Sequence, residues 1–537
     1  MKEKFALWYL LFLEYIKRDW KKILFWVVGL AAFSGGFAPY FDDIAQGSGL
    51  VGMYETMQNP AMMAMVGPTP ITNSGDYTIG AMYANEMLLF CGLFAMIISV
   101  LHVVGHTRKE EDLGLQELIR SFRVGRQANS LAVILENTLI NVLVGVGTAA
   151  LLISFDMSSI DVTGSLLFAA SIALAGILGG VLGLLVAQIM ATSAGATGGA
   201  LSIVGVLYLL RAVTDVSHVQ WSMVNPMGWT YLTYPFTENR WYPIVFGVIF
   251  ALVVTLIAFL LEGNRDLSDG YLPEWEGRGK APRSLLSVPG LLFRNNRGVA
   301  LGWLIGYGVM GLAYGSIYGD MQTFMEGNDL MKQMFTHSGI SLEASFTATI
   351  MMVMIGLAVI LPVVVINKLY AAETRLYLSQ IFATKVSRGQ LYWWNMILAF
   401  LFALLAILIS AGGLGGSALA VMSTKTTLTM ASFMEAGLNY LPVILFFMGL
   451  AGLALGFAPG LGKLIYAYLG YSFAISYFGG ILDLPTWVNK TSALNWPARM
   501  PMEDFDWVPF ALTLAVSLVM IIMGAIGYRN RDLKEGA

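Results

Sequence analysis

The chain has little charge and almost no cysteine. Only 12% of its 537 residues are Asp, Glu, Lys or Arg, and 57% are hydrophobic, whereas a soluble domain is about 25% charged. A soluble fold of this length cannot bury so much apolar surface, so soluble enzymes, secreted disulfide-bonded proteins and nucleic-acid binders are excluded. The single cysteine, Cys91, allows neither an intrachain disulfide nor a cysteine metal cluster.

Long apolar stretches are what the chain has instead. Windows able to cross a hydrocarbon core of about 30 Å recur along its whole length. We predict an all-α, polytopic membrane protein with about twelve transmembrane helices, because helices satisfy their own backbone hydrogen bonds in lipid. The predicted spans are 23–40, 84–104, 131–155, 164–189, 197–213, 241–261, 299–318, 346–366, 391–418, 440–458, 461–481 and 508–528.

The N-terminal residues are amphipathic. The string MKEKFALWYLLFLEYIKRDWKKI carries charges before, within and after its apolar part, unlike a cleaved signal peptide. We expect residues 1–22 to form a helix on the membrane surface. The other predicted parts are a first six-span half at 23–261, a cytoplasmic linker at 262–298, a second six-span half at 299–528 and a cytoplasmic tail at 529–537.

Basic residues are distributed unevenly between alternate connections. With an even number of spans and both termini inside, most of the 31 Lys and Arg residues fall on the cytoplasmic side, as the positive-inside rule requires. We therefore predict a multi-pass membrane protein with both termini in the cytoplasm. The basic residues left outside are Arg211, Arg240, Lys332, Lys425, Lys490 and Arg499.

The two predicted halves repeat one another. Four positions before the last span of each half recur at a constant offset of 266 residues: Pro235/Pro501, Glu238/Asp504, Trp241/Trp507 and Pro243/Pro509. A parallel duplication of six spans is typical of transporters whose halves are related by an axis along the membrane normal. We therefore expect two pseudo-symmetric halves.

A second repeated feature follows the second span of each half. GHTRKEEDLGLQELIRSFRVGR at 105–126 and LYAAETRLYLSQIFATKVSR at 369–388 share residues at an offset of 262, among them Glu111/Glu373, Val124/Val386 and Arg126/Arg388. Both predict short amphipathic helices at the inner surface. In the first copy we expect the apolar side chains Leu113, Leu118 and Ile119 to pack inward and the carboxylates to face water or a partner protein: Glu110, Glu111, Asp112 and Glu117. The alternative is a solvated interfacial loop.

The string RKEEDLGLQELIRSFRVGR resembles the cytoplasmic coupling segment of bacterial ABC exporter permeases, in which Arg, two acidic residues, Gly, Glu, a hydrophobic pair and Val-x-Arg follow one another. With two fused six-span halves, the chain is most similar to the polyketide-antibiotic exporter group. The resemblance assigns coupling to an ATPase subunit to Arg108, Glu110, Glu111, Gly114, Glu117, Val124 and Arg126, and in the second copy to Glu373, Val386 and Arg388. The second copy departs from the pattern at Ala372, Leu376 and Ser379.

The resemblance implies the permease subunit of an ATP-driven exporter in the bacterial cytoplasmic membrane, without a catalytic residue or cofactor of its own. ATP and Mg would be bound by two copies of a cytoplasmic ATP-binding subunit. The nearest string to a phosphate-binding loop, GFAPGLGKL at 456–464, has Phe457 in place of the first glycine and Leu464 in place of the hydroxyl residue. The implied cargo is a hydrophobic or amphipathic compound moved outward by alternating access, first an antibiotic-like small molecule, then a lipid or a peptide.

Few polar side chains lie within the predicted spans. Candidates for a substrate path are Glu86, Glu136, Asn141 and Arg211; the alternative for each is snorkelling or a structural hydrogen bond between helices. His102 and His106 are one helical turn apart, but no third ligand is evident and we predict no metal site. An ion- or proton-coupled secondary transporter is the alternative function, and the scarcity of titratable residues in the spans counts against it.

Overall fold

The computed structural model describes residues 4–45, 49–58, 60–272, 279–319, 341–422, 428–478 and 485–533. These residues form helices joined by turns and short 3₁₀ segments, and they contain no strand. Eleven helices within these ranges are long and apolar enough to cross a membrane. The predicted all-α, multi-pass architecture is confirmed. The described chain divides into two compact units, one up to residue 276 and one from residue 277 on.

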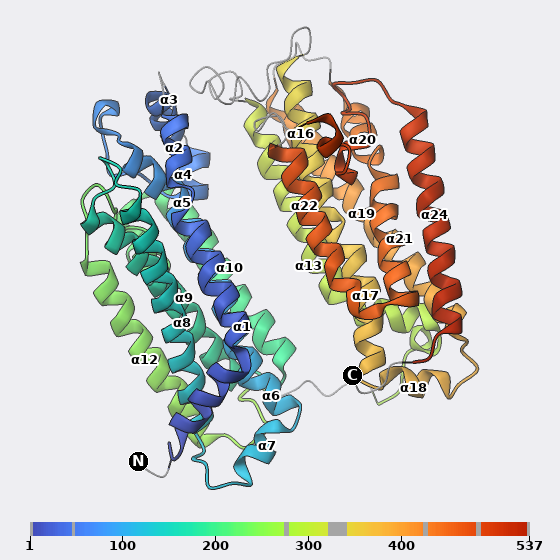
Figure 1. Cartoon of the computed structure of the whole chain (residues 1–537), viewed down its shortest axis with the longest axis horizontal. Coiled ribbons are helices and arrows are strands. Elements are labelled where there is room, and N and C mark those ends of the chain that lie inside the picture. Colours follow the sequence, from blue (N-terminus) through green and yellow to red (C-terminus); the bar gives the residue numbers. More distant parts are fainter. Residues whose placement is uncertain are drawn as a thin grey trace. The chain divides into compact units, whose positions relative to one another are not determined.

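The first unit contains six of these spans, and α9 lies at its centre (Figure 1). α9 packs against α5, α8, α10 and α12, while α1 packs along α8. The spans are α1 (Trp8–Gly35, continued by α2, Ala38–Ile44), α5 (Ile79–His106), α8 (Ala128–Ser154), α9 (Val162–Ile189), α10 (Ser193–Ser217) and α12 (Tyr242–Asn264). Their connections hold α3 (Gly49–Met57), α4 (Pro60–Val66), η1 (Ser74–Asp76), α6 (Arg108–Asp112), α7 (Leu115–Arg120), α11 (Val219–Ser222) and η2 (Gly228–Thr230).

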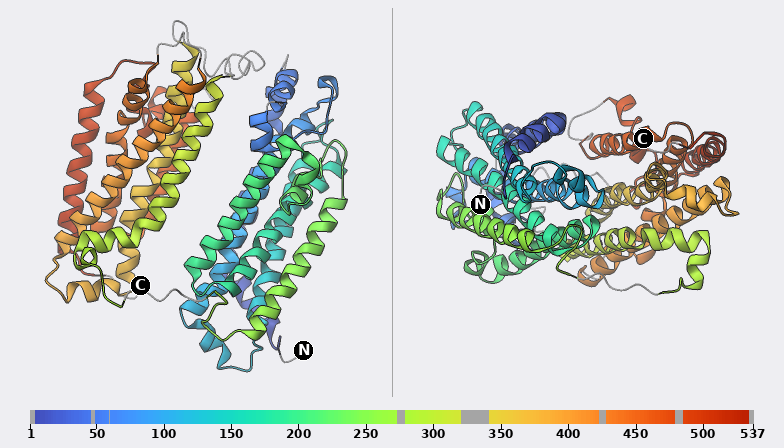
Figure 2. Two further views of the ribbon diagram at one scale, coloured as in Figure 1. Left: turned by 180° about the vertical axis from the view of Figure 1, so that it is seen from behind. Right: turned by 90° about the horizontal axis from the view of Figure 1, so that it is seen from below.

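The second unit contains five spans in its described residues (Figures 1 and 2). They are α13 (Val288–Ser316), α16 with α17 (Leu342–Ala358, Ile360–Thr374), α19 (Arg388–Val421), α20 with α21 (Met430–Leu438, Leu441–Phe457) and α24 (Trp507–Asn530). The shorter helices are η3 (Arg283–Leu286), η4 (Ile317–Gly319), α18 (Tyr377–Phe382), η5 (Pro459–Lys463), α22 (Leu464–Phe478), α23 (Thr486–Asn489) and η6 (Ala493–Asn495).

Packing within the two units follows the sequence repeat. In the first unit α5 and α12 both pack on α9, and α1 packs on α8. In the second unit α17 and α24 both pack on α21, and α13 packs on α19. The repeated tryptophans also have equivalent places, because Trp241 caps the start of α12 and Trp507 is the first residue of α24.

Proline explains why two spans of the second unit are each divided into two helices. Pro362 has no N–H to donate to the carbonyl oxygen of Ala358, and Pro442 has none to donate to that of Leu438. α16 ends at Ala358 and α20 ends at Leu438, four residues before the proline in each case. Each interruption is therefore a local consequence of the sequence.

Three predicted boundaries differ from the structure. No break separates residues 1–22 from the first span, because α1 runs from Trp8 to Gly35 and buries Tyr15 and Asp19 against the first unit. The linker is shorter than 262–298, since α12 continues to Asn264 and α13 begins at Val288. The predicted span 461–481 corresponds to α22, of which 15 residues are described. Residues 479–481 lie outside the described ranges, so this twelfth span stays a prediction.

Candidate functional site

Residues 105–126, here called the first cap segment, fold into two short helices beyond the end of α5 (Figure 1). α6 covers Arg108–Asp112 and α7 covers Leu115–Arg120, and between them Gly114 has φ of 73°. This left-handed conformation costs an L residue about 1–2 kcal/mol, so glycine suits the turn. The segment is helical as predicted, but it is divided into two short helices at Gly114.

Arg108 and Glu111 are buried within the first unit. Both terminal nitrogens of Arg265 donate to the Glu111 carboxylate, at 2.8 and 2.7 Å, and Arg108 donates to it at 2.9 Å. Burial alone would raise the pKa of the Glu111 carboxyl, but the hydrogen bonds and charge of Arg265 hold that pKa below its usual value. Arg108 also donates to the backbone carbonyl oxygens of Ala191, Ser268 and Asp269.

Glu110 is buried on another side of the same short helix and joins α6 to α1. It accepts hydrogen bonds from the Tyr15 hydroxyl and the Arg18 guanidinium at 3.0 Å, and His106 Nδ1 lies 3.2 Å away. Burial disfavours its charged form, yet hydrogen bonding to His106 and the charge of Arg18 lower the pKa of the Glu110 carboxyl. Glu110 therefore anchors the first cap segment to the N-terminal helix.

The predicted orientation of this amphipathic segment is wrong. Glu110 and Glu111 are buried, whereas Leu113, Leu118 and Phe122 are 59%, 62% and 68% exposed. The carboxylates turn inward because arginines from α1 and from the end of α12 pair with them. Asp112 and Glu117 are exposed as predicted, and Ile119 is half-buried. The outer surface of the segment is therefore apolar at its centre.

Residues 369–388, the second cap segment, repeat part of this arrangement. Leu376 occupies the position of Gly114 with φ of 64°, and it precedes α18. Glu373 is buried and accepts hydrogen bonds from both terminal nitrogens of Arg531, each at 2.6 Å. Arg388 donates to the backbone carbonyl oxygen of Arg531, just as Arg126 donates to that of Arg265.

The left-handed conformation of Leu376 in the second cap segment leads to a direct prediction. We expect Leu376→Gly to stabilise the second unit by about 1 kcal/mol, because glycine adopts a positive φ without the steric cost that leucine bears. Thermal unfolding of the purified protein measures this, with Leu461→Gly as control, an exposed leucine in η5. An equal or lower midpoint for Leu376→Gly than for Leu461→Gly would contradict the prediction.

Glu136 and Asn141, two candidates for a substrate path, lie on α8 and face neighbouring helices. The Glu136 carboxylate is fully buried, 3.3 Å from His102 Nε2 on α5. Asn141 donates to Ser99 Oγ at 3.0 Å, also on α5. These contacts match the structural alternative, in which polar side chains join helices; a role in substrate passage stays a prediction.

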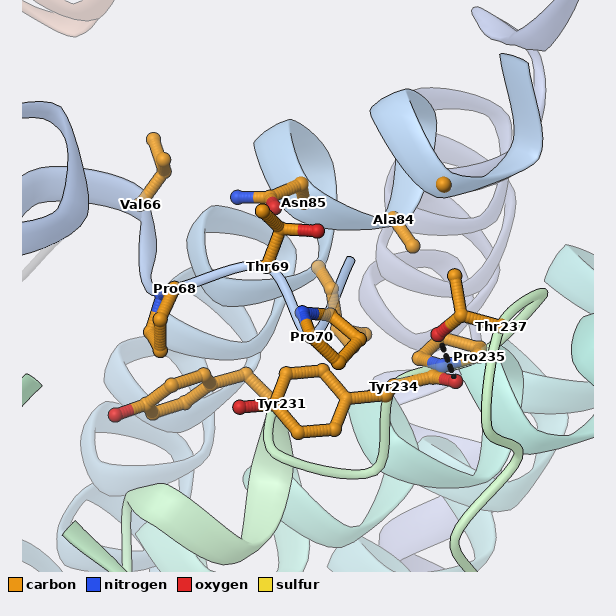
Figure 3. Close-up of a pocket in the computed structure, with 12 residues that line it drawn as sticks. Val66, Pro68, Thr69, Pro70, Ala84, Asn85, Tyr231, Tyr234, Pro235 and Thr237 are labelled. Atoms are coloured by element: carbon orange, nitrogen blue, oxygen red, sulfur yellow. Dashed lines mark hydrogen bonds between the residues drawn. The ribbon is translucent and has the colours of Figure 1, made fainter. Parts of the chain in front are cut away.

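Glu86 and Arg211 lie in other parts of the first unit. Glu86 is half-buried on α5, and its Oε1 has no hydrogen-bond partner among the described residues. Arg211 is fully buried on α10 and pairs with Asp215 at 2.9 Å. A small pocket is bordered by Pro70, Asn85 and Tyr231 (Figure 3), but none of the four candidates lines it. The four residues are not brought together.

His102 and His106 are not arranged as metal ligands. His102 faces Glu136, and His106 Nε2 lies 3.1 Å from Asp19 while its Nδ1 faces Glu110. Among the described residues no group of three or more His, Cys, Asp or Glu has the geometry to hold a metal ion.

Sequence reasoning missed the partners of the buried charges: Tyr15, Arg18, Asp19, Arg265 and Arg531. A signal was present for two of them, since Arg265 and Arg531 are separated by the offset of 266 that relates Trp241 to Trp507. The others sit in a segment interpreted as a surface helix, where charged residues need no partner.

Comparison with known proteins agrees with this architecture. Residues 285–529 match the family described as "Multidrug efflux system permease Rv1217c, C-terminal domain". The chain is 27% identical over 492 residues to the multidrug efflux system permease protein Rv1217c of Mycobacterium tuberculosis, an alignment that covers 89% of this chain and 86% of the relative. The similarity includes both units, and the chain is a homologue of this multidrug efflux permease, as its resemblance to ABC exporter permeases led us to expect.

Proposed function

We propose that the chain is the permease subunit of an ABC exporter that moves hydrophobic or amphipathic compounds out of a bacterial cell. The observation that carries the proposal is homology, over most of the chain, to a permease of a multidrug efflux system. The two cap segments support it, because each is a compact element at the end of its own helical unit where another protein can dock. Antibiotic-like small molecules are the first cargo class to test.

The first cap segment offers an apolar docking surface. Leu113 directly follows α6, Leu118 lies in α7 and Phe122 comes just after α7, and all three are more than half exposed. The Glu110 and Glu111 carboxylates, by contrast, are paired inside the unit. Exposed clusters of large apolar side chains are typical of protein interfaces. We propose that two copies of an ATP-binding subunit, which carry the ATP and Mg, dock on the first and second cap segments from the cytoplasm.

The proposed cycle follows from this docking. Both termini are cytoplasmic in the proposed topology, so the cap segments face the ATP-binding subunits and the opposite ends of the spans face outward. ATP-driven closure of the motor pair displaces the cap segments, and the permease alternates between inward-facing and outward-facing states. The chain itself binds and releases cargo and performs no hydrolysis.

A docking variant tests the proposal. We expect the double substitution Leu118→Asp/Phe122→Asp to abolish co-purification of the ATP-binding subunit and ATP-dependent efflux of ethidium from cells, because desolvating two added carboxylates opposes an apolar interface. Leu286→Asp is the matched control, since Leu286 is 78% exposed and lies outside both cap segments. Normal co-purification and efflux in the double variant would exclude docking at this surface.

A proton-coupled secondary transporter is the second candidate, and one observation favours it. Although titratable residues are scarce in the sequence of the spans, the first unit gathers several at one place: Asp19, His102, His106, Glu110 and Glu136. Such clusters accompany proton pathways in transporters. Ethidium transport into inverted vesicles separates the two functions. Transport by an ABC exporter requires ATP and continues when a protonophore is added. Transport by a proton-coupled carrier requires a proton gradient instead of ATP and stops when a protonophore is added.

A further inference from the structure

The ion pairs between the cap segments and the last spans occur once in each unit. Arg265 is the first residue after α12 and Arg531 is the first residue after α24. Both terminal nitrogens of each arginine donate hydrogen bonds to a buried glutamate of the cap segment, Glu111 or Glu373. We call each set of these contacts, together with the hydrogen bond from Arg126 or Arg388 to the arginine's backbone carbonyl, a clamp.

The two cap segments differ at most positions, but the charged residues of the clamp are identical in both. The positions matched to Arg108, Glu110, Gly114 and Glu117 hold Tyr370, Ala372, Leu376 and Ser379. The three residues that build the clamp are the same in both copies: Glu111/Glu373, Arg126/Arg388 and Arg265/Arg531. Ile119/Ile381 and Val124/Val386 are also shared, but the clamp residues are the shared set that joins the cap segment to the last span.

The clamp is also mechanically suited to transmit force. The side chains of Arg265 and Glu111 are 8% and 5% exposed, and those of Arg531 and Glu373 are 12% and 1% exposed. A buried, bidentate arginine–carboxylate pair fixes direction as well as distance, and breaking it leaves an unpaired buried charge. In sequence, the first cap segment connects only α5 and α8, whereas the clamp adds α12, which is distant along the chain.

We propose that Arg265 and Arg531 are positioning residues that carry the movement of each cap segment to the last span of its unit. α12 packs on the central helix α9, and α24 packs on α21 and α19. A displacement of the cap segment thus reaches the centre of the unit through the clamp as well as through the adjoining helices. This inference rests on the proposed function, because the displacement comes from a docked ATP-binding subunit.

The test measures coupling in proteoliposomes that contain the permease with its ATP-binding subunits. We expect Arg531→Ala to reduce the ethidium transported per ATP hydrolysed by about tenfold, with co-purification and basal ATP hydrolysis retained. Arg529→Ala is the matched control, because Arg529 is exposed and lies two residues earlier, in the last turn of α24. The charge exchange Glu373→Arg/Arg531→Glu should restore much of the coupling. In the first unit the corresponding exchange would place the introduced arginine beside Arg108, which pairs with Glu111.

Hydrogen exchange of the permease alone distinguishes failure of the clamp from failure of the proposed function. Arg531→Ala should speed amide exchange in residues 369–388 and at the end of α24, and the charge exchange should reverse this. If amide exchange in Arg531→Ala is unchanged, the clamp does not hold the second cap segment to α24, whether or not ATP-binding subunits associate with the permease. Faster exchange with unaltered transport per ATP overturns the transmission role. If no ATP-binding subunit associates even with the unaltered permease, the proposed function fails and the transmission role fails with it.

Discussion

Replacing Asp215 by alanine is expected to destabilise the first unit by about 3–5 kcal/mol, because it leaves the Arg211 guanidinium buried without its counter-charge. The pair is fully buried on α10, with 2.9 Å between Arg211 and the Asp215 carboxylate. The Tyr231 hydroxyl donates to the same carboxylate at 2.7 Å, and Arg211 donates to the carbonyl oxygen of Met65 at 2.9 Å. One substitution therefore removes the centre of a network that joins α10 to two connecting segments.

The midpoint of thermal unfolding of the purified protein measures this effect. Val213→Ala is the control, since Val213 is 68% exposed on the same helix. The double substitution Arg211→Met/Asp215→Leu should recover part of the loss, because no charge then remains buried, although Tyr231 loses its acceptor. Equal midpoints for Asp215→Ala and Val213→Ala would show that the network contributes little to stability.

This network favours a structural role for Arg211. A guanidinium that binds passing cargo must exchange its partners, whereas both terminal nitrogens of Arg211 are held by a carboxylate and by backbone carbonyls. The rings of Tyr208 and Tyr231 also lie against its guanidinium, and only its Nε has no partner among the described residues. If Arg211 bound a substrate, its buried ion pair with Asp215 would have to break. Efflux by the double Arg211→Met/Asp215→Leu variant at the unaltered rate would agree with this structural role.

Features encoded along the chain could be predicted from the sequence. The apolar windows located eleven spans. They could do so because a helix satisfies its backbone hydrogen bonds internally, so a long apolar stretch in lipid must be helical. The two constant offsets identified the repeat, which reappears as equivalent packing around α9 and α21. The position of the first cap segment was also predicted, whereas its division into two helices at Gly114 was not.

The orientation of the cap segments could not be predicted, because it depends on partners far away in the sequence. Glu110 is paired with Arg18, and Glu111 with Arg265 at a separation of 154 residues. An amphipathic pattern assigns carboxylates to water unless such partners are known, and here arginines make burial of the carboxylates favourable. The continuity of α1 was missed for the same reason, since Asp19 finds its partner His106 on α5.

Glycine spacing in α9 shows how sequence and packing agree at the centre of the first unit. Gly176 and Gly180 face α8, where a Cβ would meet Asn141 and Asn137, while Gly179 faces α5 at Met96. Gly183, which faces Val100, completes a second small-residue pair, so α9 presents one such pair to α8 and one to α5. These glycines therefore allow the close contact of α9 with α5 and α8.

Gly179→Ala is therefore expected to cost about 3 kcal/mol of stability. A Cβ at this position would lie 2.4 Å from the backbone oxygen of Met96, and a backbone cannot rotate away as a side chain can. Gly183→Ala is expected to be milder, with its closest approach at 3.3 Å. Gly205→Ala on α10 is the matched control, because nothing lies within 4 Å of its Cβ. Thermal unfolding in one detergent ranks the three variants. If Gly179→Ala unfolded at the temperature of Gly205→Ala, close contact between α5 and α9 would not be what holds the first unit together.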